Sequence, residues 1–296
     1  MDQQTISVII PTKANPERRA LLKRAIQSVL AQENVHAVPV VVVNGSDRDP
    51  ELMSELVTDR RLRVTTMELA DLPTALRVGR ESVDTAWFAE LDDDDVFMPG
   101  ALVTRKEALE KEPEFDVVVT NGVRRGTNGD KLHFVEDISI IRADPLRAMW
   151  RHNWLLPGSW LCRADAVGTE IFKTIPKFRE CTYLGLQFAI KYRIKFLDCP
   201  TVIYHTDTPQ SESKSQQYAL GVAHATRQML ELNLPLDLRR SLRIALGRAC
   251  SANANYYLEK KDFCAAWSWY CQSLSGPGKW RRVLFARRFA YALFRS

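Results

Sequence analysis

The first half of the chain alternates short, continuous apolar runs with longer segments in which apolar residues recur every three or four positions. The continuous runs predict buried strands, at residues 6–10, 40–43, 62–66, 87–91 and 116–120. The periodic segments predict amphipathic helices, at residues 18–32, 50–58, 74–83 and 99–111. Buried strands alternating with such helices indicate a Rossmann-like α/β fold, with a mostly parallel sheet between two layers of helices.

The second half follows a different pattern. A turn is predicted at 126–130 (Gly-Thr-Asn-Gly-Asp), where it forms the tip of a hairpin. Further predicted elements are short strands at 158–163, 194–197 and 202–204, a helix at 182–192, and a helix pair over 252–274 that turns at 260–262. From about residue 215 onward the chain is predicted to be helical. We therefore expect an α/β domain over residues 1–214 and a helical C-terminal region over residues 215–296.

Three polar loops, at residues 11–14, 44–47 and 92–95, follow predicted strand ends. Ligands of open α/β sheets bind beyond the carboxyl ends of the strands, so these loops form the expected site. The third loop is the most charged, because Glu90 and residues 92–95 place five carboxylates in six positions. Two unit charges about 4 Å apart repel by roughly 1 kcal/mol in water and by several near a protein surface. A divalent cation with hard oxygen ligands removes that cost, whereas a solvated acidic turn is the alternative interpretation.

Composition excludes several classes of protein. With 296 residues, of which 46% are hydrophobic and 26% charged, the chain is not an intrinsically disordered one. Its apolar runs stay below the roughly 18–20 residues that cross a bilayer. The first residues lack the pattern of a secretory signal, and the six cysteines form no Cys-x-x-Cys pair. We interpret the cysteines as reduced thiols, in preference to disulfides, and expect a cytoplasmic protein.

Four segments, in order and at sensible spacing, resemble family 2 glycosyltransferases. They are Ile-Ser-Val-Ile-Ile-Pro-Thr (6–12), Ser-Val-Leu-Ala-Gln (28–32), Val-Val-Val-Asn-Gly-Ser-Asp (41–47) and Ala-Glu-Leu-Asp-Asp-Asp-Asp-Val-Phe-Met-Pro (89–99). The resemblance is strong over residues 5–115 and moderate to about 215. It implies a GT-A fold and a metal-dependent, inverting transfer of a sugar from a nucleotide-diphosphate donor. The implied acceptor is a saccharide or a lipid-linked molecule, as in the synthesis of cell-envelope or surface polysaccharides.

The resemblance identifies Asp92-x-Asp94 as the Asp-x-Asp motif, which holds Mn²⁺ or Mg²⁺ against the leaving diphosphate. Asp94 is then the direct metal contact, and Asp92 or Asp93 faces the ribose or a metal-bound water. Asp95 has the alternative role of capping the following helix. A third metal ligand is expected from His205 or, by a strict count along the sequence, from residue 207.

The resemblance also implies a set of donor-binding residues, which are Pro11, Thr12, Lys13, Asn44, Asp47, Arg77, Arg80, Asp92 and Asp93. The first loop approaches the nucleotide base in this interpretation, and Asp47 contacts the ribose or the base. Asn44 departs from the family, in which Asp is usual, and it can bind a base edge only as a neutral group. The usual Arg-Asn pair of the later helix is also altered here. Arg77 and Arg80 there either reach the donor phosphates or lie on a solvated helix face.

An inverting transferase needs a carboxylate that takes the proton of the acceptor hydroxyl. The family places this base in a Glu-Asp pair at the start of a helix, and this chain has Glu180 followed by Cys181. Glu180 is therefore the predicted base, with another carboxylate as the alternative. The acceptor is expected near residues 150–160, which include His152, Trp154 and Trp160. Aromatic rings stack on sugar faces, and a place in the core is the alternative interpretation for each of them. Two rival functions remain open: a catalytically inactive scaffold that binds a nucleotide sugar, and a nucleotidyltransferase on a similar fold.

The end of the sequence is basic and aromatic. Residues 279–296 contain six arginines and lysines and no acidic residue, within a net charge of +5 for the whole chain. This composition is typical of an interfacial amphipathic helix, so it predicts peripheral binding to an anionic membrane, such as the inner face of the plasma membrane. The alternative is a helix packed on the protein with a solvated basic face. We expect no nucleic-acid partner, because no nucleic-acid-binding motif accompanies the charge.

Overall fold

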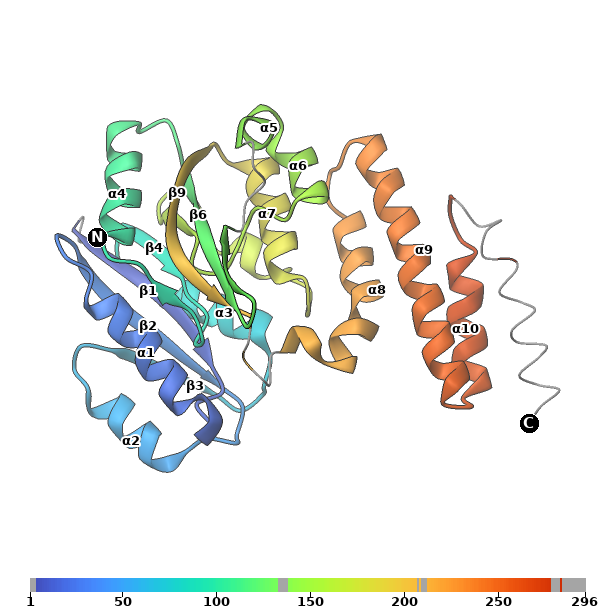
Figure 1. Cartoon of the computed structure of the whole chain (residues 1–296), viewed down its shortest axis with the longest axis horizontal. Helices are drawn as coiled ribbons and strands as arrows, with labels where there is room; N and C mark the ends of the chain where they lie inside the picture. The colour runs from blue at the N-terminus through green and yellow to red at the C-terminus, as the bar shows by residue number, and fades with distance from the viewer. Residues whose placement is uncertain (1–3, 133–137, 207, 209–211, 278–282, 284–296) are drawn as a thin grey trace. The chain divides into compact units, whose positions relative to one another are not determined.

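The computed structural model describes residues 4–132, 138–206, 208, 212–277 and 283. The chain forms two compact units, residues 1–209 and residues 210–296. The first unit contains the sheet and the second contains helices (Figure 1). The assignment of functional domains to 1–214 and 215–296 stays a prediction.

A nine-stranded sheet forms the centre of the first unit. Its strands are β1 (Thr5–Thr12), β2 (His36–Asn44), β3 (Arg63–Met67), β4 (Trp87–Glu90), β5 (Val96–Phe97), β6 (Val117–Gly126), β7 (Gly129–Leu132), β8 (Trp160–Arg163) and β9 (Ile194–His205). They lie in the order β3-β2-β1-β4-β8-β6-β9-β5, with β7 paired to β6. The strands β1 to β4 pair in parallel, as predicted. The pairings of β8 with β4 and β6, of β7 with β6 and of β5 with β9 are antiparallel, so the sheet as a whole is mixed.

Helices cover both faces of the sheet, as the alternation of strands and helices predicts. The helices of this unit are α1 (Arg19–Leu30), α2 (Pro50–Thr58), α3 (Leu72–Glu81), α4 (Ala101–Lys111), α5 (Ile138–Ala143), α6 (Pro145–Arg151) and α7 (Glu180–Lys191). One core joins Ile6, Val8 and Ile10 of β1 to buried residues of α1, α2 and α4. On the opposite face α3 approaches β1 so closely that a Cβ atom at Gly79 would lie 2.4 Å from Cγ2 of Ile9.

The later strands differ from the sequence-based expectation. Residues 194–197 and 202–204 are expected as two strands but form one, β9, because its pairing with β6 continues across two register shifts, in which the extra residues of β9 lie opposite residues 120–122. The strand β5 was not predicted, since two residues carry no periodicity. The hairpin turn expected at 126–130 is confirmed by the pairing of Gly126 with Gly129.

Arg105 is fully buried and joins three parts of the first unit. Its guanidinium donates to the carbonyl oxygens of Gly158 and Trp160 and to Oγ1 of Thr201, and it lies over the ring of Phe97. These partners belong to β5, to β9, and to β8 with the residues just before it. A buried cation is tolerated here because every side of its planar fork finds an acceptor.

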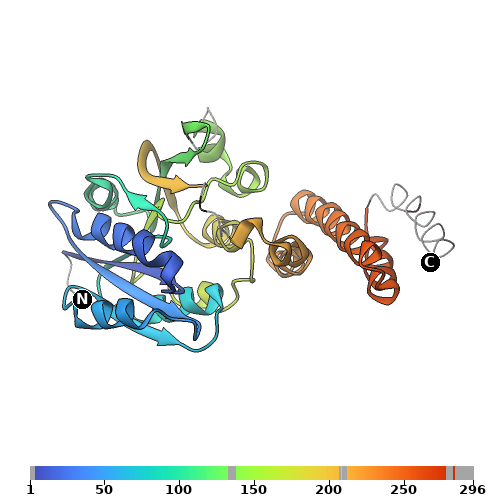
Figure 2. The ribbon, with the colours of Figure 1, turned by 60° about the horizontal axis from the view of Figure 1, so that its bottom comes forward.

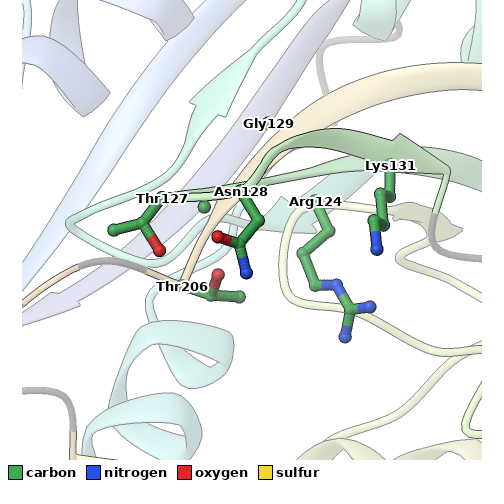
Figure 3. A pocket seen from close by; sticks show the side chains of 7 residues that line it. Arg124, Thr127, Asn128, Gly129, Lys131 and Thr206 are labelled. Carbon is green, nitrogen blue, oxygen red and sulfur yellow. The ribbon is translucent and has the colours of Figure 1, made fainter.

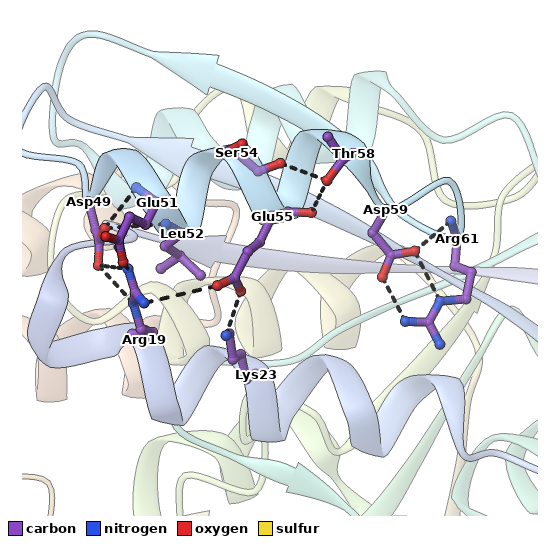
Figure 4. A network of polar contacts seen from close by, with 10 residues as sticks. All are labelled: Arg19, Lys23, Asp49, Glu51, Leu52, Ser54, Glu55, Thr58, Asp59 and Arg61. Atoms are coloured by element: carbon purple, nitrogen blue, oxygen red, sulfur yellow. Dashed lines mark hydrogen bonds and ion pairs between the residues drawn. The ribbon is translucent and has the colours of Figure 1, made fainter.

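A more exposed polar network connects α1 and α2 (Figure 4). Asp49 caps α2 by accepting from the backbone N–H groups of Glu51 and Leu52, and it also accepts two hydrogen bonds of 2.8 Å from Arg19. Farther along α1, Lys23 pairs with Glu55 at 2.5 Å. Beyond α2, Asp59 pairs with Arg61 near the surface.

The second unit consists of α8 (Gln216–Leu230), α9 (Leu236–Glu259) and α10 (Phe263–Ser273). The predicted helix pair is confirmed, because α9 and α10 lie side by side across the turn at residues 260–262 (Figures 1 and 2). Ala254, Ala266 and Tyr270 form a small core between them. No helix in the described part of the chain combines the length and the apolar character needed to span a bilayer. Apart from residue 283, the predicted membrane-binding segment 279–296 lies outside the described residues.

We expect Arg105→Met to lower the free energy of unfolding by about 3 kcal/mol, because it leaves buried acceptors without a donor. The matched control is Arg61→Met, which removes an exposed ion pair and costs at most about 1 kcal/mol. Urea unfolding followed by circular dichroism measures both. Equal midpoints for the two variants would show that the Arg105 contacts do not stabilise the fold.

Candidate functional site

The carboxyl ends of β1, β2 and β4 meet at one edge of the sheet. The side-chain amide of Asn44, the last residue of β2, donates to the carbonyl oxygen of Thr12 at 3.0 Å. The hydroxyl of Thr12 donates in turn to Oδ2 of Asp93 at 2.6 Å. The three polar loops that the sequence places after strand ends are therefore adjacent. Asn44 acts here as a neutral bridge between strands, a role that an Asp carboxylate could not play as a donor.

The loop after β4 holds three carboxylates whose oxygens lie within 4.8 Å of one another: Asp92, Asp94 and Asp95. Asp95 is fully buried. Burial raises the pKa of Asp95 to about 7, and burial together with the neighbouring Asp95 charge raises the pKa of Asp92. Glu90, at the end of β4, has its pKa raised to about 8 by burial and by the Glu180 and Asp95 charges. The cluster therefore carries negative charge that its surroundings poorly stabilise.

Arg18 supplies the nearest compensating charge. Its Nη1 lies 2.9 Å from Oδ1 of Asp93 and 3.1 Å from Oδ2 of Asp94. Burial raises the pKa of Asp93 to about 6, although Arg18 and the Thr12 hydrogen bond oppose that rise. Arg24, two turns along α1, donates to the carbonyl oxygen of Asp94. The first helix thus fixes the acidic loop from one side.

The chemistry of this cluster fits a divalent cation. Hard cations prefer carboxylate oxygens, and Asp92, Asp94 and Asp95 can each offer one from a confined space. Oδ2 of Asp95 is buried and accepts no hydrogen bond from the described residues. Because a buried, unpartnered carboxylate oxygen is costly, a cation at this position would stabilise both the oxygen and the loop.

The structure gives Asp95 a different position from the helix cap considered above. Helix α4 begins after Gly100, which has a left-handed φ of 74° and makes no side-chain cap. Asp95 instead accepts the backbone N–H of His205 at 2.8 Å. The His205 Nδ1 lies 3.8 Å from Oδ1 of Asp95, which is too long for a hydrogen bond. His205 therefore lies beside the cluster, its role as a ligand stays a prediction, and Asp95 joins the candidate ligands; residue 207 lies outside the described residues.

The start of α7 faces the same cluster. Glu180 is the first residue of this helix, and one of its carboxylate oxygens accepts the backbone N–H of Phe178 at 2.8 Å. Phe178 and Arg179 both have left-handed φ angles, of 68° and 64°, which cost free energy in residues other than glycine. Such strain is common at functional sites, and here it turns the chain so that Glu180 opens the helix beside Glu90.

Cys181 occupies the place where the family resemblance led us to expect Asp. Burial raises the pKa of its thiol well above the usual range, and the charges of Glu90, Asp92 and Glu180 raise it further. The thiol is therefore neutral at physiological pH. It is unsuited to act as a base, and it adds no charge to the cluster.

The remaining predicted donor residues differ in their surroundings. Lys13 and Asp47 are exposed at the sheet edge, and Pro11 is buried at the end of β1. Arg77 is partly exposed and pairs with Glu81 at 3.0 Å. Arg80 is buried: it donates to carbonyl oxygens of the segment after β8, at residues 164 and 167, and lies over the ring of Phe88. Its guanidinium thus supports the fold beneath the sheet.

The aromatic residues expected near the acceptor are mostly core residues. Trp154 and Trp160 are fully buried, and Trp160 makes edge contacts with Phe88 and Phe188. His152 is exposed. Other residues of the cluster were missed in the sequence: Arg18, Glu90 as a buried acid, and Tyr204, whose pKa is raised by burial and by Asp92. For Tyr204, the one signal in the sequence was its position directly before His205.

Comparisons with known proteins agree with this architecture. The sequence model described as glycosyl transferase family 2 matches residues 7–164, more than half of the chain. Among solved structures, the chain is similar to S. aureus TarS 1-349 in complex with UDP-GlcNAc, at 14% identity and a TM-score of 0.60, over 90% of this chain and 79% of that chain. It is also similar to S. aureus TarS 1-349 in complex with UDP, at 15% identity and a TM-score of 0.54, over 86% and 75% of the two chains. No curated protein sequence matches this chain significantly.

We expect Arg18→Met to lower the free energy of unfolding by about 3 kcal/mol, because it leaves Asp93 buried without its cation. The double variant Arg18→Met/Asp93→Asn should recover much of that loss, and denaturant unfolding of the full cycle measures the coupling. Lys23→Met, which breaks an exposed pair on the same helix, is the control and should cost at most about 1 kcal/mol. Purely additive losses in the cycle would contradict the assigned role of Arg18.

Proposed function

Because the chain belongs to glycosyl transferase family 2, we propose that it moves a sugar from a nucleotide-diphosphate donor to a saccharide or lipid-linked acceptor. We propose further that the reaction is metal-dependent and inverts the anomeric carbon. The chain is a glycosyltransferase with a GT-A-type fold. The observation that supports metal dependence is the carboxylate cluster at the end of β4. In this reaction the nucleotide diphosphate leaves the sugar as an anion, and a cation held by the cluster would neutralise its charge.

The donor would bind at the edge of the sheet formed by β1, β2 and β4. TarS was solved with UDP-GlcNAc and with UDP, which supports a nucleotide-sugar donor for this chain as well. Lys13 and Asp47 are exposed there and are the proposed contacts to the nucleotide. Since Asn44 is neutral, the identity of the base is a question for binding measurements with more than one nucleotide.

Asp92, Asp94 and Asp95 are the residues that would hold Mn²⁺ or Mg²⁺. When bound, such an ion neutralises the charge that develops on the departing diphosphate. Arg18 keeps Asp93 and Asp94 in place without a metal ligand of its own. The buried position of Asp95 would keep water away from one side of the site.

Glu180 is the proposed general base. The acceptor hydroxyl would attack the anomeric carbon while its proton passes to a carboxylate oxygen of Glu180, and the bond to the diphosphate breaks on the opposite face of the sugar. The Phe178 N–H holds this carboxylate at the start of α7. Cys181 beside it is a neutral thiol, which supports Glu180 as the proton acceptor.

The acceptor and the location in the cell are parts of the proposal. A role in cell-envelope or surface polysaccharide synthesis, and peripheral binding to an anionic membrane through residues 279–296, would suit a lipid-linked acceptor. The second candidate function is a catalytically inactive scaffold that binds the nucleotide sugar. It is favoured by the thiol of Cys181, which replaces the expected second carboxylate.

Asp94→Asn should abolish metal-dependent nucleotide binding, because it removes one of the three clustered carboxylates. Calorimetric titration of UDP and GDP, each with and without Mn²⁺, measures the loss. The control is Glu114→Gln, an exposed carboxylate before β6 at the opposite edge of the sheet. Retention of metal-dependent binding in Asp94→Asn would refute the metal site.

Glu180→Gln should lower the rate of sugar transfer on the order of 10²–10⁴-fold, because a carboxamide takes no proton. Gln keeps an oxygen that can accept the Phe178 N–H, so donor affinity and thermal stability should be unchanged. A transfer assay with the released nucleotide as readout, combined with donor titration, tests both. An undiminished rate would move the base to another residue, and donor binding without turnover in the unaltered protein would favour the scaffold.

A further inference from the structure

The hairpin of β6 and β7 carries two cations directly opposite each other. Arg124 of β6 is in register with Lys131 of β7. Neither side chain makes an ion pair or a hydrogen bond with any residue that the structure describes. Like charges in directly opposed positions destabilise an antiparallel pair. The next register pair shows the usual solution, because Arg125 and Asp130 form a salt bridge at 2.8 Å.

The face of the hairpin that bears Arg124 and Lys131 contains a recess. Side chains alternate along a strand, so Gly126 and Gly129 point to the face that bears Arg124 and Lys131. A Cβ atom at Gly126 would lie 2.8 Å from Oγ1 of Thr206, so only glycine leaves space for that hydroxyl. The result is a recess of about 180 Å³, lined by Arg124, Gly126, Thr127, Asn128, Gly129, Lys131 and Thr206. Figure 3 shows the Arg124, Asn128 and Lys131 side chains extending to one side of the hairpin, with Thr206 nearby.

The size and the donors of the recess define what fits it. Pockets that enclose a whole drug-sized ligand measure about 300–1,000 Å³, so this recess takes one chemical group. A guanidinium offers a planar set of N–H donors and an ammonium offers a point charge, and both bind oxyanions well. The amide of Asn128 adds a neutral donor, whereas the hydroxyl of Thr206 already donates to the carbonyl oxygen of Arg125 at 3.0 Å and only lines the recess. The recess is therefore suited to a phosphate, sulfate or carboxylate group.

A short series of backbone contacts connects the recess to the carboxylate cluster. Arg125 of β6 is opposite His205 of β9, and the N–H of Thr206 donates to the carbonyl oxygen of Arg125 at 2.9 Å. His205 in turn donates its N–H to Asp95. One residue of β9 thus separates the recess from the proposed metal site. The proposed donor site is at the ends of β1, β2 and β4, whereas the recess is on the β6–β7 hairpin, so the two sites use different elements of the sheet.

We propose that the recess between Arg124, Lys131 and Thr206 binds an oxyanion group of the acceptor, and that the acceptor is an anionic glycan bearing phosphate, sulfate or carboxylate. The anion site stands on the hairpin geometry, whereas its assignment to the acceptor rests on the proposed function. Binding of the anion would neutralise the opposed cations and so order the hairpin beside the transfer site.

The first test is a titration of the full chain with inorganic phosphate, followed by amide NMR shifts. We expect shifts at Thr127, Asn128 and Thr206, and an affinity that falls on the order of tenfold in Arg124→Gln and in Lys131→Gln. Arg125→Gln is the matched control, because it removes the same charge from the opposite face of the same hairpin. An equal loss in that control, or an absence of shifts in the unaltered protein, would overturn the site.

The second test assigns the anion to one substrate. Phosphate should still bind when UDP and Mn²⁺ are present at saturation, and a phosphorylated oligosaccharide should bind more tightly than its neutral counterpart only while Arg124 and Lys131 are intact. Displacement of phosphate by UDP would assign the recess to the donor and overturn the proposal. Failure of every nucleoside diphosphate tested, UDP and GDP included, to bind would refute the proposed function, while the phosphate titration would still report on the recess.

Discussion

The burial of several carboxylates in one short loop is the constraint on which the rest of the site depends. Asp93 and Asp95 are nearly or fully buried directly after β4, in surroundings that raise the pKa of both. A protein keeps such a loop folded only if other groups compensate the charge. Here Thr12 and Arg18 contact Asp93, and the N–H of His205 contacts Asp95. The groups that compensate the acidic loop therefore come from distant parts of the chain.

The fold makes these contacts possible because parallel strands bring their carboxyl ends to one edge. β1 lies between β2 and β4, so the loops that follow all three strands are neighbours. The antiparallel half of the sheet adds the other side, with β9 carrying His205 past Asp95 and α7 presenting Glu180. This arrangement explains how one sheet can hold the proposed donor loop and the proposed base, which are about ninety positions apart in the sequence.

The sequence predicted the first half of the fold well, because continuous apolar strands and periodic helices are local signals. It also located the acidic cluster, whose residues are consecutive. It did not predict Arg18, because an arginine at a helix start has no pattern that distinguishes it from a solvated one. The position of Asp95 was missed because its partner, His205, is 110 residues away, and local sequence patterns do not show such a contact. The prediction divided β9 in two because residues 198–201 (Asp-Cys-Pro-Thr) interrupt its apolar run.

The contact between Asp95 and His205 also has a consequence for synthesis. The strands β1 to β4 can pair once residue 90 has left the ribosome, but the N–H group that Asp95 accepts follows Asp95 by 110 residues. At about 5–20 residues per second, this interval lasts roughly 5–20 s. During that time Asp93 can already contact Thr12 and Arg18, but Asp95 lacks the N–H group that it accepts in the finished protein and remains hydrated. The nascent α/β core can therefore form before the acidic site at its edge is complete, and a truncated product ending before β9 would have strands β1 to β4 but no finished acidic site.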